Sequence, residues 1–264
     1  MKTSTERMIA KKDGSIGWIQ FNNPARRNAL SVDMWKAVPE ILAEFENDQA
    51  IRVVVLNGAG GKAFISGADI SEFEQERASR ENILEYDKIA GRAFDALITF
   101  PKPTIAMIQG YCIGGGLGVA LCCDLRLAAD NSRFAVPAAK LGLGYAYDGI
   151  KRLVDVVGPS FAMEIFYTAR QFDSAEALQM GLVNRVVASH DIETFVRDYA
   201  GLIGGNAPLT IKAVKLCVGE ACKDLDKRDL VAAQAAVGAC FESADYAEGR
   251  TAFLQKRRPV FGGR

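Results

Sequence analysis

The sequence predicts an α/β protein, and three observations lead to that fold class. Two near-continuous apolar segments, Arg52–Leu56 and Thr104–Ile108, are typical of strands in a sheet that is covered on both faces. Segments with a helical spacing of apolar residues alternate with such strands along the chain. From Ile192 onward every pattern is helical, and Gly204-Gly205-Asn206-Ala207-Pro208 is expected to be a hinge. We therefore divide the chain near residue 205 into a core, residues 1–205, and a helical C-terminal region, residues 206–264.

The first elements follow from local patterns. Ser15–Phe21 alternates as a strand, and the Asn-Asn-Pro motif in Asn22–Arg27 predicts a turn. Ser31 is expected to cap a helix whose apolar residues share one face. Pro39 lies inside that helix and should end or kink it near Val38, because proline lacks the backbone donor.

The middle of the chain combines a strand, a glycine turn and a helix. Pro103–Ile108 is predicted to be a buried strand, Gly114–Gly116 a tight turn and Leu117–Cys123 a buried helix. Short strands are expected at Asp124–Ala128 and Phe134–Val136. Helical patterns then occur at Ile150–Val157, Ser160–Thr168, Ser174–Met180, Ile192–Ile203, Pro208–Val218, Leu230–Phe241 and Ala244–Lys256, with a short apolar stretch at Leu182–Val187.

Composition excludes several classes of protein. The 32 basic and 32 acidic residues cancel, so no basic surface points to nucleic acid. Met1–Gly14 lacks the apolar core of a signal peptide and no apolar run is long enough to span a membrane, so we expect a cytoplasmic protein without a membrane partner. The cysteines lack metal-site spacing and are expected to be buried, reduced thiols: Cys112, Cys122, Cys123, Cys217, Cys222 and Cys240.

The glycine turn is a candidate anion site. Three consecutive glycines before a helix leave backbone N–H groups pointing outward. A phosphate-binding loop needs a Lys-Ser/Thr pair and a dinucleotide site needs Gly-x-Gly-x-x-Gly, and Gly114–Gly116 followed by Leu117 fits neither motif. An oxyanion hole is the remaining functional interpretation, and a purely structural turn is its alternative.

Two further stretches join this turn. Lys62-Ala63-Phe64-Ile65-Ser66-Gly67-Ala68-Asp69-Ile70 and Phe21-Asn22-Asn23-Pro24-Ala25-Arg26-Arg27-Asn28-Ala29-Leu30 occur with it in the order and spacing of the crotonase (enoyl-CoA hydratase/isomerase) superfamily, which the chain resembles from about Ile16 to Phe261. The resemblance implies a crotonase fold of repeated ββα units and an acyl-CoA substrate with no further cofactor. It also implies that residues 206–264 pack between subunits in homotrimers or dimers of trimers.

The resemblance also assigns binding roles. The N–H groups of Ala68 and Gly115 would hold the thioester oxygen and favour an enolate. Arg26 and Lys62 would approach the CoA phosphates. Further contacts to CoA would come from backbone groups of Ser66 and Ala68 and from Phe253 and Lys256, the last two in the same or a neighbouring subunit.

The acid–base residues of the hydratases are missing. Their two glutamates correspond here to Gly118 and Ala138, whereas Pro137–Tyr145 is similar to the methylmalonyl-CoA decarboxylase branch, which has a tyrosine at the position of Tyr145. Decarboxylation needs no general base, so a decarboxylase-type lyase is our first interpretation. An ordinary half-buried Tyr145 is the structural alternative.

Other activities remain as alternatives at this point. A hydratase could take its acids from Asp148 or Glu72, although a solvated position is the simpler expectation for both. A catalytically silent CoA-binding subunit is the third possibility. His190, the single histidine, is expected on the surface at a helix start, which disfavours the dehalogenases of the superfamily.

Overall fold

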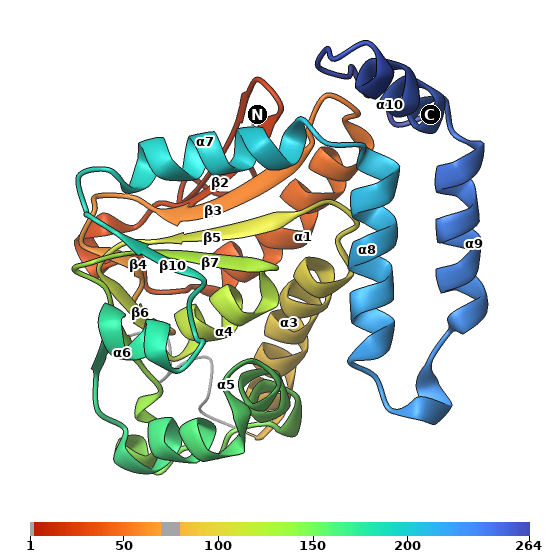
Figure 1. Ribbon diagram of the computed structural model, residues 1–264. Helices are drawn as coiled ribbons and strands as arrows, with labels where there is room; N and C mark the ends of the chain where they lie inside the picture. Colours follow the sequence, from red (N-terminus) through yellow and green to blue (C-terminus); the bar gives the residue numbers. More distant parts are fainter. Residues whose placement is uncertain (1–2, 70–79) are drawn as a thin grey trace.

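The structure, a computed structural model, describes residues 3–69 and 80–264 (Figure 1). A six-stranded sheet has the order β1-β2-β3-β5-β7-β10, with β1 and β2 antiparallel and the other neighbours parallel. The α/β fold class is thereby confirmed. The strands are β1 (Met8–Asp13), β2 (Ile16–Phe21), β3 (Val53–Gly58), β5 (Thr104–Ile108), β7 (Leu125–Ala129) and β10 (Arg185–Val187).

A second sheet of four short strands has the order β4-β6-β8-β9, parallel except for the β8–β9 pair. A strand of the first sheet precedes each of β4, β6 and β8, and a helix follows, which is the expected repeated ββα unit of the crotonase fold. The sequence patterns predicted only β8 of this sheet. Its strands are β4 (Ala63–Ile65), β6 (Tyr111–Ile113), β8 (Arg133–Ala135) and β9 (Phe172–Asp173).

Helices cover both faces of the six-stranded sheet. Alternate residues of β3 belong to two apolar clusters: Val54 and Leu56 pack with the larger one, while Val53 and Val55 pack with a smaller one beneath α7 (Ile192–Gly204). This two-sided burial explains the near-continuous apolar pattern of β3. The larger cluster includes residues of α1 (Val32–Asn47), α3 (Arg80–Thr99) and α4 (Gly115–Cys122).

Helix α1 differs from expectation in two ways. It continues through Pro39 to Asn47, so the prediction that it ends near Val38 is wrong. Val38 and the apolar residues of the following turns are fully buried, and this packing offsets the hydrogen bond that proline cannot donate. Ser31 precedes the helix as predicted, but its hydroxyl contacts the Asp33 carboxylate and makes no capping bond to a backbone N–H.

The chain after β8 is mostly helical. The two helices predicted between residues 150 and 168 are joined in α5 (Tyr147–Thr168), which is interrupted at Gly158 where φ is +76°. The predicted helix at Ser174 is α6 (Ser174–Gln179), and its Asp173 forms a capping box with Glu176. Helix α7 ends at Gly204, beside the boundary that we drew near residue 205.

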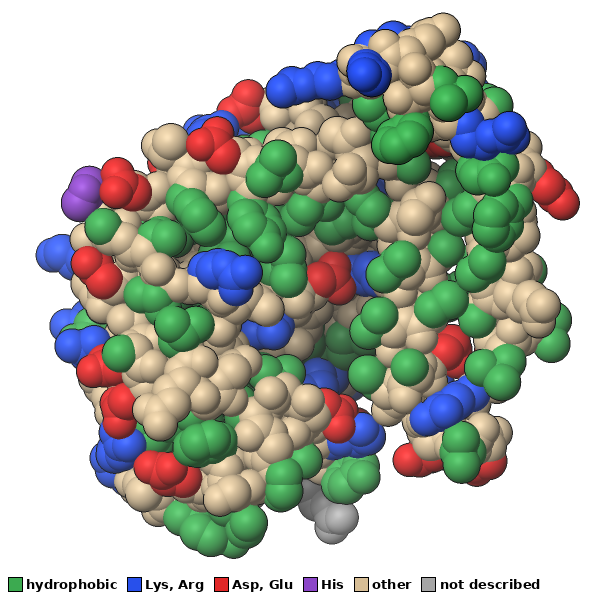
Figure 2. Space-filling model, viewed as in Figure 1, with side chains coloured by type: hydrophobic (Ala, Val, Ile, Leu, Met, Phe, Trp, Pro, Cys, Tyr) green, Lys and Arg blue, Asp and Glu red, His purple; other side chains and the backbone are tan. Residues whose placement is uncertain are grey.

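The last three helices extend away from the sheets (Figure 1). They are α8 (Pro208–Ala221), α9 (Leu230–Glu242) and α10 (Ala244–Leu254), and α9 contains no buried residue in this single chain. Figure 2 shows apolar side chains gathered along α8 and α9. Val214, Val218 and Phe241 are among the large apolar residues exposed there.

The predicted burial of the cysteines is confirmed in part, and the predicted exposure of the histidine is confirmed. Cys112, Cys122 and Cys123 are buried free thiols, but Cys217 and Cys240 are only half-buried and Cys222 is exposed. The expectation of burial is therefore wrong for the three cysteines of the C-terminal helices, because these helices bury little surface in one chain. His190 is exposed beside Asp191, as expected (Figure 2, purple). Among residues 3–69 and 80–264, no helix is both long and apolar enough to cross a bilayer.

Candidate active site

Two adjacent strand ends bring the predicted N–H donors together. Strands β4 and β6 are parallel neighbours, with Ile65 paired to Cys112, and they lead into the Ala68 loop and into α4 respectively. A Cβ placed on Gly115 would lie 3.9 Å from the backbone nitrogen of Ala68. The loop and the start of the helix are therefore in direct contact.

The peptide groups that carry these two N–H donors are each held in place by a hydrogen bond to their carbonyl oxygen. The carbonyl of Gly67 accepts from the N–H of Leu30 at 2.8 Å, and the carbonyl of Gly114 accepts from the N–H of Gly118 at 3.0 Å. In a trans peptide the N–H points away from the carbonyl, so the N–H groups of Ala68 and Gly115 point away from these partners. Within the described ranges neither N–H has an acceptor.

Glycine is required where the two segments meet. Gly67 has φ +115°, and Gly114 has φ +53° with ψ −115°, conformations that side chains disfavour. A Cβ on Gly116 would lie 2.3 Å from the carbonyl oxygen of Ile65, so only glycine lets α4 start this close to β4. The triple glycine is thus a structural requirement and also the means by which the two donors approach each other.

Apolar side chains form the wall beside the donors. A Cβ on Gly115 would lie 3.3 Å from Leu30 Cδ1 and 3.7 Å from the Trp35 ring. The Trp35 ring packs edge to face against Phe94 with centroids 5.0 Å apart, and its Nε1–H donates to the hydroxyl of Tyr86 at 3.0 Å. Such a wall excludes water, which strengthens hydrogen bonds to a developing negative charge.

The two positions expected to carry glutamates lie in apolar surroundings. A Cβ on Gly118 would lie 3.2 Å from the Phe94 ring, so this ring occupies the space next to position 118. Ala138 is buried in a short 3₁₀ helix, Pro137–Leu141. Neither position contributes a carboxylate, and neither leaves a polar gap.

Tyr145 is half-buried just before α5. Its ring packs edge to face against Phe166, with centroids 5.0 Å apart, and its hydroxyl has no hydrogen-bond partner within the described part of the chain. Burial raises the pKa of Tyr145, while the charge of Arg152 opposes that rise. The phenol therefore stays protonated at neutral pH and can act as a hydrogen-bond donor. Asp148 is exposed in the first turn of α5, and Glu72 lies outside the described residues.

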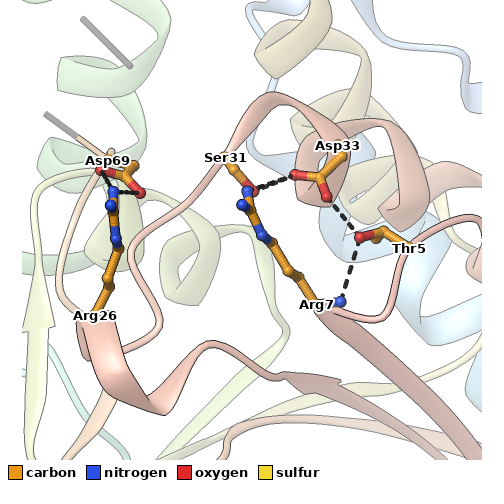
Figure 3. A network of polar contacts seen from close by, with 6 residues as sticks. All are labelled: Thr5, Arg7, Arg26, Ser31, Asp33 and Asp69. Atoms are coloured by element: carbon orange, nitrogen blue, oxygen red, sulfur yellow. Dashed lines mark hydrogen bonds and ion pairs between the residues drawn. The ribbon is translucent and has the colours of Figure 1, made fainter. Parts of the chain in front are cut away.

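Arg26 has a partner that the sequence patterns did not reveal. Its Nη1 lies 2.9 and 2.8 Å from the two carboxylate oxygens of Asp69, the residue after Ala68 (Figure 3). The Arg26 side chain is 55% exposed and that of Asp69 is 7% exposed. The ion pair therefore helps to hold the Ala68 loop, and more than half of the Arg26 side chain is exposed.

The other predicted CoA contacts differ in position. Lys62 is exposed, and its side chain forms no ion pair with any described residue. The N–H of Ser66 donates to the carbonyl of Arg27 at 3.1 Å, so of its backbone groups the carbonyl is the one left for a ligand. Phe253 and Lys256 are exposed on and just after α10, which Figure 1 shows at the upper right of the molecule, apart from α4 near its middle.

Asn28 joins the turns that surround the Ala68 loop. It is buried with φ +56°, and its Nδ2 donates to the carbonyls of Ala59 and Ala63 at 3.0 and 2.8 Å. Its Oδ1 accepts from the N–H of Asn23 at 2.9 Å. The sequence motif that contains Asn28 predicted no role for it. In the structure its side chain joins the segment at Asn23 to the segment at Ala59–Ala63 through three hydrogen bonds.

A second polar group shown in Figure 3 attaches the N-terminal segment to the first turn of α1. Thr5, Arg7 and Ser31 all contact the carboxylate of Asp33. Burial raises the pKa of Asp33, but the hydrogen bonds from Ser31 and Thr5, with the Arg7 charge, hold it below the usual value. Among the residues that the structure describes, no hydrogen bond or ion pair joins this group to the Arg26–Asp69 pair, and the group positions the start of α1.

Comparisons with known proteins show which family the chain resembles. A family model described as enoyl-CoA hydratase/isomerase matches residues 11–264. The chain is 34% identical to a short-chain-enoyl-CoA hydratase of Clostridium acetobutylicum (95% of each chain) and 34% identical to a crotonyl-CoA hydratase of Syntrophomonas wolfei (97% and 98%). A crystal structure described as an enoyl-CoA hydratase/carnithine racemase from Magnetospirillum magneticum superposes with a TM-score of 0.93 at 37% identity, over 99% of this chain and 97% of that one.

Proposed function

This chain belongs to the enoyl-CoA hydratase/isomerase family, and we propose that it is an acyl-CoA lyase whose Ala68 and Gly115 N–H groups bind the thioester oxygen. The observation that supports this proposal is that the two donors are adjacent, are oriented by their peptide groups, and have no acceptor among residues 3–69 and 80–264. Negative charge on the oxygen grows as the thioester becomes an enolate, so both hydrogen bonds strengthen along the reaction. One such donor contributes about 3–4 kcal/mol.

For the reaction itself we propose addition of water to an enoyl-CoA. The relatives are named as hydratases, which favours this alternative over the decarboxylase that the missing glutamates had placed first. Hydration needs one group to take a proton from water and one to deliver a proton to the substrate carbon. Since Gly118 and Ala138 supply neither, Asp148 or Glu72 is the acid to test first.

Decarboxylation is the second candidate, because one observation favours it. The Phe94 ring fills the space beside Gly118, and Ala138 is buried, so these two positions provide no general base. Loss of CO₂ leaves its electron pair on the α-carbon as an enolate, which the two N–H groups would stabilise without any base. The Tyr145 hydroxyl would then act as a donor to the substrate.

A panel of CoA thioesters separates these reactions. Purified protein is incubated with crotonyl-CoA, a 3-enoyl-CoA, methylmalonyl-CoA and a saturated thioester, and products are identified by mass. Gain of one water by crotonyl-CoA supports hydration, and loss of CO₂ from methylmalonyl-CoA supports the second candidate. If wild-type protein retains no thioester on equilibrium dialysis, the acyl-CoA assignment is wrong.

Proline substitutions test the two donors. Ala68→Pro and Gly115→Pro each delete one N–H and should abolish turnover. Gly115 is the first residue of α4, a position where proline is tolerated, so this variant is expected to fold. Leu230→Pro, at the first position of α9, is the matched control for proline at a helix start and should stay folded. Near-normal rates in folded Gly115→Pro protein would contradict the assignment.

For binding of the CoA portion of the substrate we propose contacts from Lys62, from Arg26 and from the Ser66 and Ala68 backbone. Lys62 offers an exposed charge without an ion pair among described residues, and the Arg26 side chain is 55% exposed. Lys62→Gln should weaken binding of free CoA, and Lys212→Gln, on α8, serves as a charge-matched control.

For the assembly we propose that α8–α10 join copies of this chain into homotrimers or dimers of trimers. The exposed apolar residues of these helices support this proposal, and Phe253 and Lys256 of a neighbouring copy would then cover the CoA. Light scattering after gel filtration measures the mass of the particle. A monomer at micromolar concentration would refute this arrangement.

A further inference from the structure

Arg126 is a buried charged residue at the C-terminal end of α4, the helix whose first residue is the donor Gly115. It is the second residue of β7, and only 7% of it is exposed. Its Nη1 donates to the carbonyl of Cys123 at 2.8 Å, and its Nε donates to the carbonyl of Leu182 at 2.8 Å. Because Cys123 is the C-cap of α4, the guanidinium binds the carbonyl at the end of that helix.

The main chain of Arg126 is held as firmly as its side chain. Its N–H donates to Oδ1 of Asn184 at 2.8 Å, and its carbonyl accepts from the N–H of Asn184 at 2.8 Å. Asn184 directly precedes β10, which pairs with β7 from the next residue onward. The guanidinium therefore has a fixed place, and it connects the end of α4 to the six-stranded sheet.

No carboxylate forms an ion pair with Arg126 among residues 3–69 and 80–264. Asp124 attracts it at longer range, but Asp124 is itself paired with Lys215 at 2.8 Å. The other groups that act on its charge are thiols whose pKa burial raises, so they are uncharged at neutral pH: Cys112, Cys122 and Cys123. Burial lowers the pKa of Arg126, but a guanidinium stays protonated in proteins. A full positive charge that water screens little therefore lies at the end of α4.

The two ends of α4 carry opposite partial charges. The aligned peptide dipoles of a helix are equivalent to about +0.5 charge at its N-terminus and about −0.5 at its C-terminus. Helix α4 has 8 residues and is therefore about 12 Å long, so its negative end is close enough to oppose negative charge near Gly115. A cation bonded to the terminal carbonyl cancels this opposition.

We propose that Arg126 is a positioning residue that acts through α4: it neutralises the C-terminal end of the helix, so that the Gly115 N–H binds a developing enolate more strongly. This inference rests on the oxyanion role proposed above and adds a residue to it. Two unit charges about 12 Å apart, at an effective dielectric constant of about 20, attract each other by an amount equal to about tenfold in rate. Since the enolate oxygen carries only part of a charge, we expect Arg126 to contribute about three- to tenfold.

Infrared difference spectra of a bound thioester test this inference without turnover. Butyryl-CoA with an isotope label at the thioester carbonyl is saturated and cannot add water, and hydrogen bonds to that carbonyl lower its stretching frequency. Arg126→Gln keeps an N–H donor for the Cys123 carbonyl but removes the charge. Its frequency shift should be smaller than that of wild-type protein, and turnover of the best substrate should fall about three- to tenfold, mainly in kcat. Arg126→Lys keeps the charge and should retain most of both.

Lys215→Met is a second test that leaves Arg126 in place. It leaves Asp124, the residue after the C-cap of α4, as an unpaired negative charge at the same helix end, so the frequency shift should again become smaller. Arg197→Gln is the matched control and should leave the spectrum unchanged. Arg197 lies on α7, on the other face of the sheet, and is paired with Glu193 at 2.8 Å.

A frequency shift that equals the wild-type shift in Arg126→Gln and Lys215→Met would overturn the inference while leaving the oxyanion assignment standing. Equal losses in Arg126→Gln and Arg126→Lys would show that the hydrogen bonds of Arg126 matter and its charge does not, which would also overturn it. If urea titration shows that Arg126→Gln is unfolded, Lys215→Met decides. If wild-type protein does not bind butyryl-CoA, or binds it without any frequency shift, the proposed function itself fails.

Discussion

Gly116→Ala tests whether the close approach of α4 to β4 positions the oxyanion donors. The added Cβ would lie 2.3 Å from the carbonyl oxygen of Ile65 and 2.7 Å from its Cβ. Carbon–oxygen contacts are normally about 3.3 Å or longer, so the start of α4 must move by about 1 Å. Gly115 moves with it, and its N–H leaves the position that faces Ala68.

The expected loss of turnover rate follows from this displacement of the Gly115 N–H. Misplacement of a reacting group by about 1 Å costs roughly 100-fold in rate, and loss of one oxyanion donor costs roughly 100- to 1,000-fold. We therefore expect turnover of the best substrate in the panel to fall about 100-fold. Overpacking destabilises by about 1–3 kcal/mol, and replacing a helical glycine by alanine returns about 1 kcal/mol. The variant should therefore remain folded.

The assay measures kcat by product mass and the free energy of unfolding by urea titration. Gly91→Ala is the matched control, because Gly91 lies within α3 and a Cβ there would have no neighbour within 4 Å. This control should gain about 1 kcal/mol of stability and keep its rate. A folded Gly116→Ala protein with near wild-type kcat would show that the position of α4 does not set catalysis.

Three further predictions concern buried groups. Asn28→Ala breaks three hydrogen bonds and leaves alanine at positive φ, so urea titration should show a loss of about 3–5 kcal/mol, and Asn28→Gly should lose about 1 kcal/mol less. Tyr145→Phe should slow turnover about tenfold or more if the hydroxyl contacts the substrate, whereas an unchanged rate makes Tyr145 structural. Burial raises the pKa of Cys122 to about 12, whereas unfolded thiols ionise near pH 8.5, so above that pH the unfolded state binds fewer protons. Stability should then fall by about 1.4 kcal/mol per pH unit for this thiol, and Cys122→Ala should reduce the slope in urea titrations at pH 8–10.

The extent to which the fold could be predicted depends on strand length and burial. β3 and β5 were found because each is buried on both faces and is apolar throughout. β4, β6 and β9 contain only two or three residues, too few to show a period of two. β1 was missed because its second half is exposed and charged, as is common at a sheet edge.

The site could be predicted where its chemistry lies in the backbone. Ala68 and Gly115 were identified from local motifs, and the structure supplies the reason for the glycines through the contact of Gly116 with Ile65. The Arg26–Asp69 pair joins residues 43 positions apart, and the contact of Arg152 with Phe94 joins α5 to α3. No local pattern in a single sequence reveals contacts of this range.

The absence of a glutamate at position 118 is built into the surrounding packing. The Phe94 ring contacts the place where a side chain would start, Trp35 supports that ring from one side, and Arg152 covers it from another. A side chain at position 118 would begin 3.2 Å from the Phe94 ring, so the ring would have to shift by a few tenths of an ångström to admit its Cβ. The glycine and the ring therefore form one arrangement, in which position 118 supplies no acid and an aromatic ring lies where a side chain would begin.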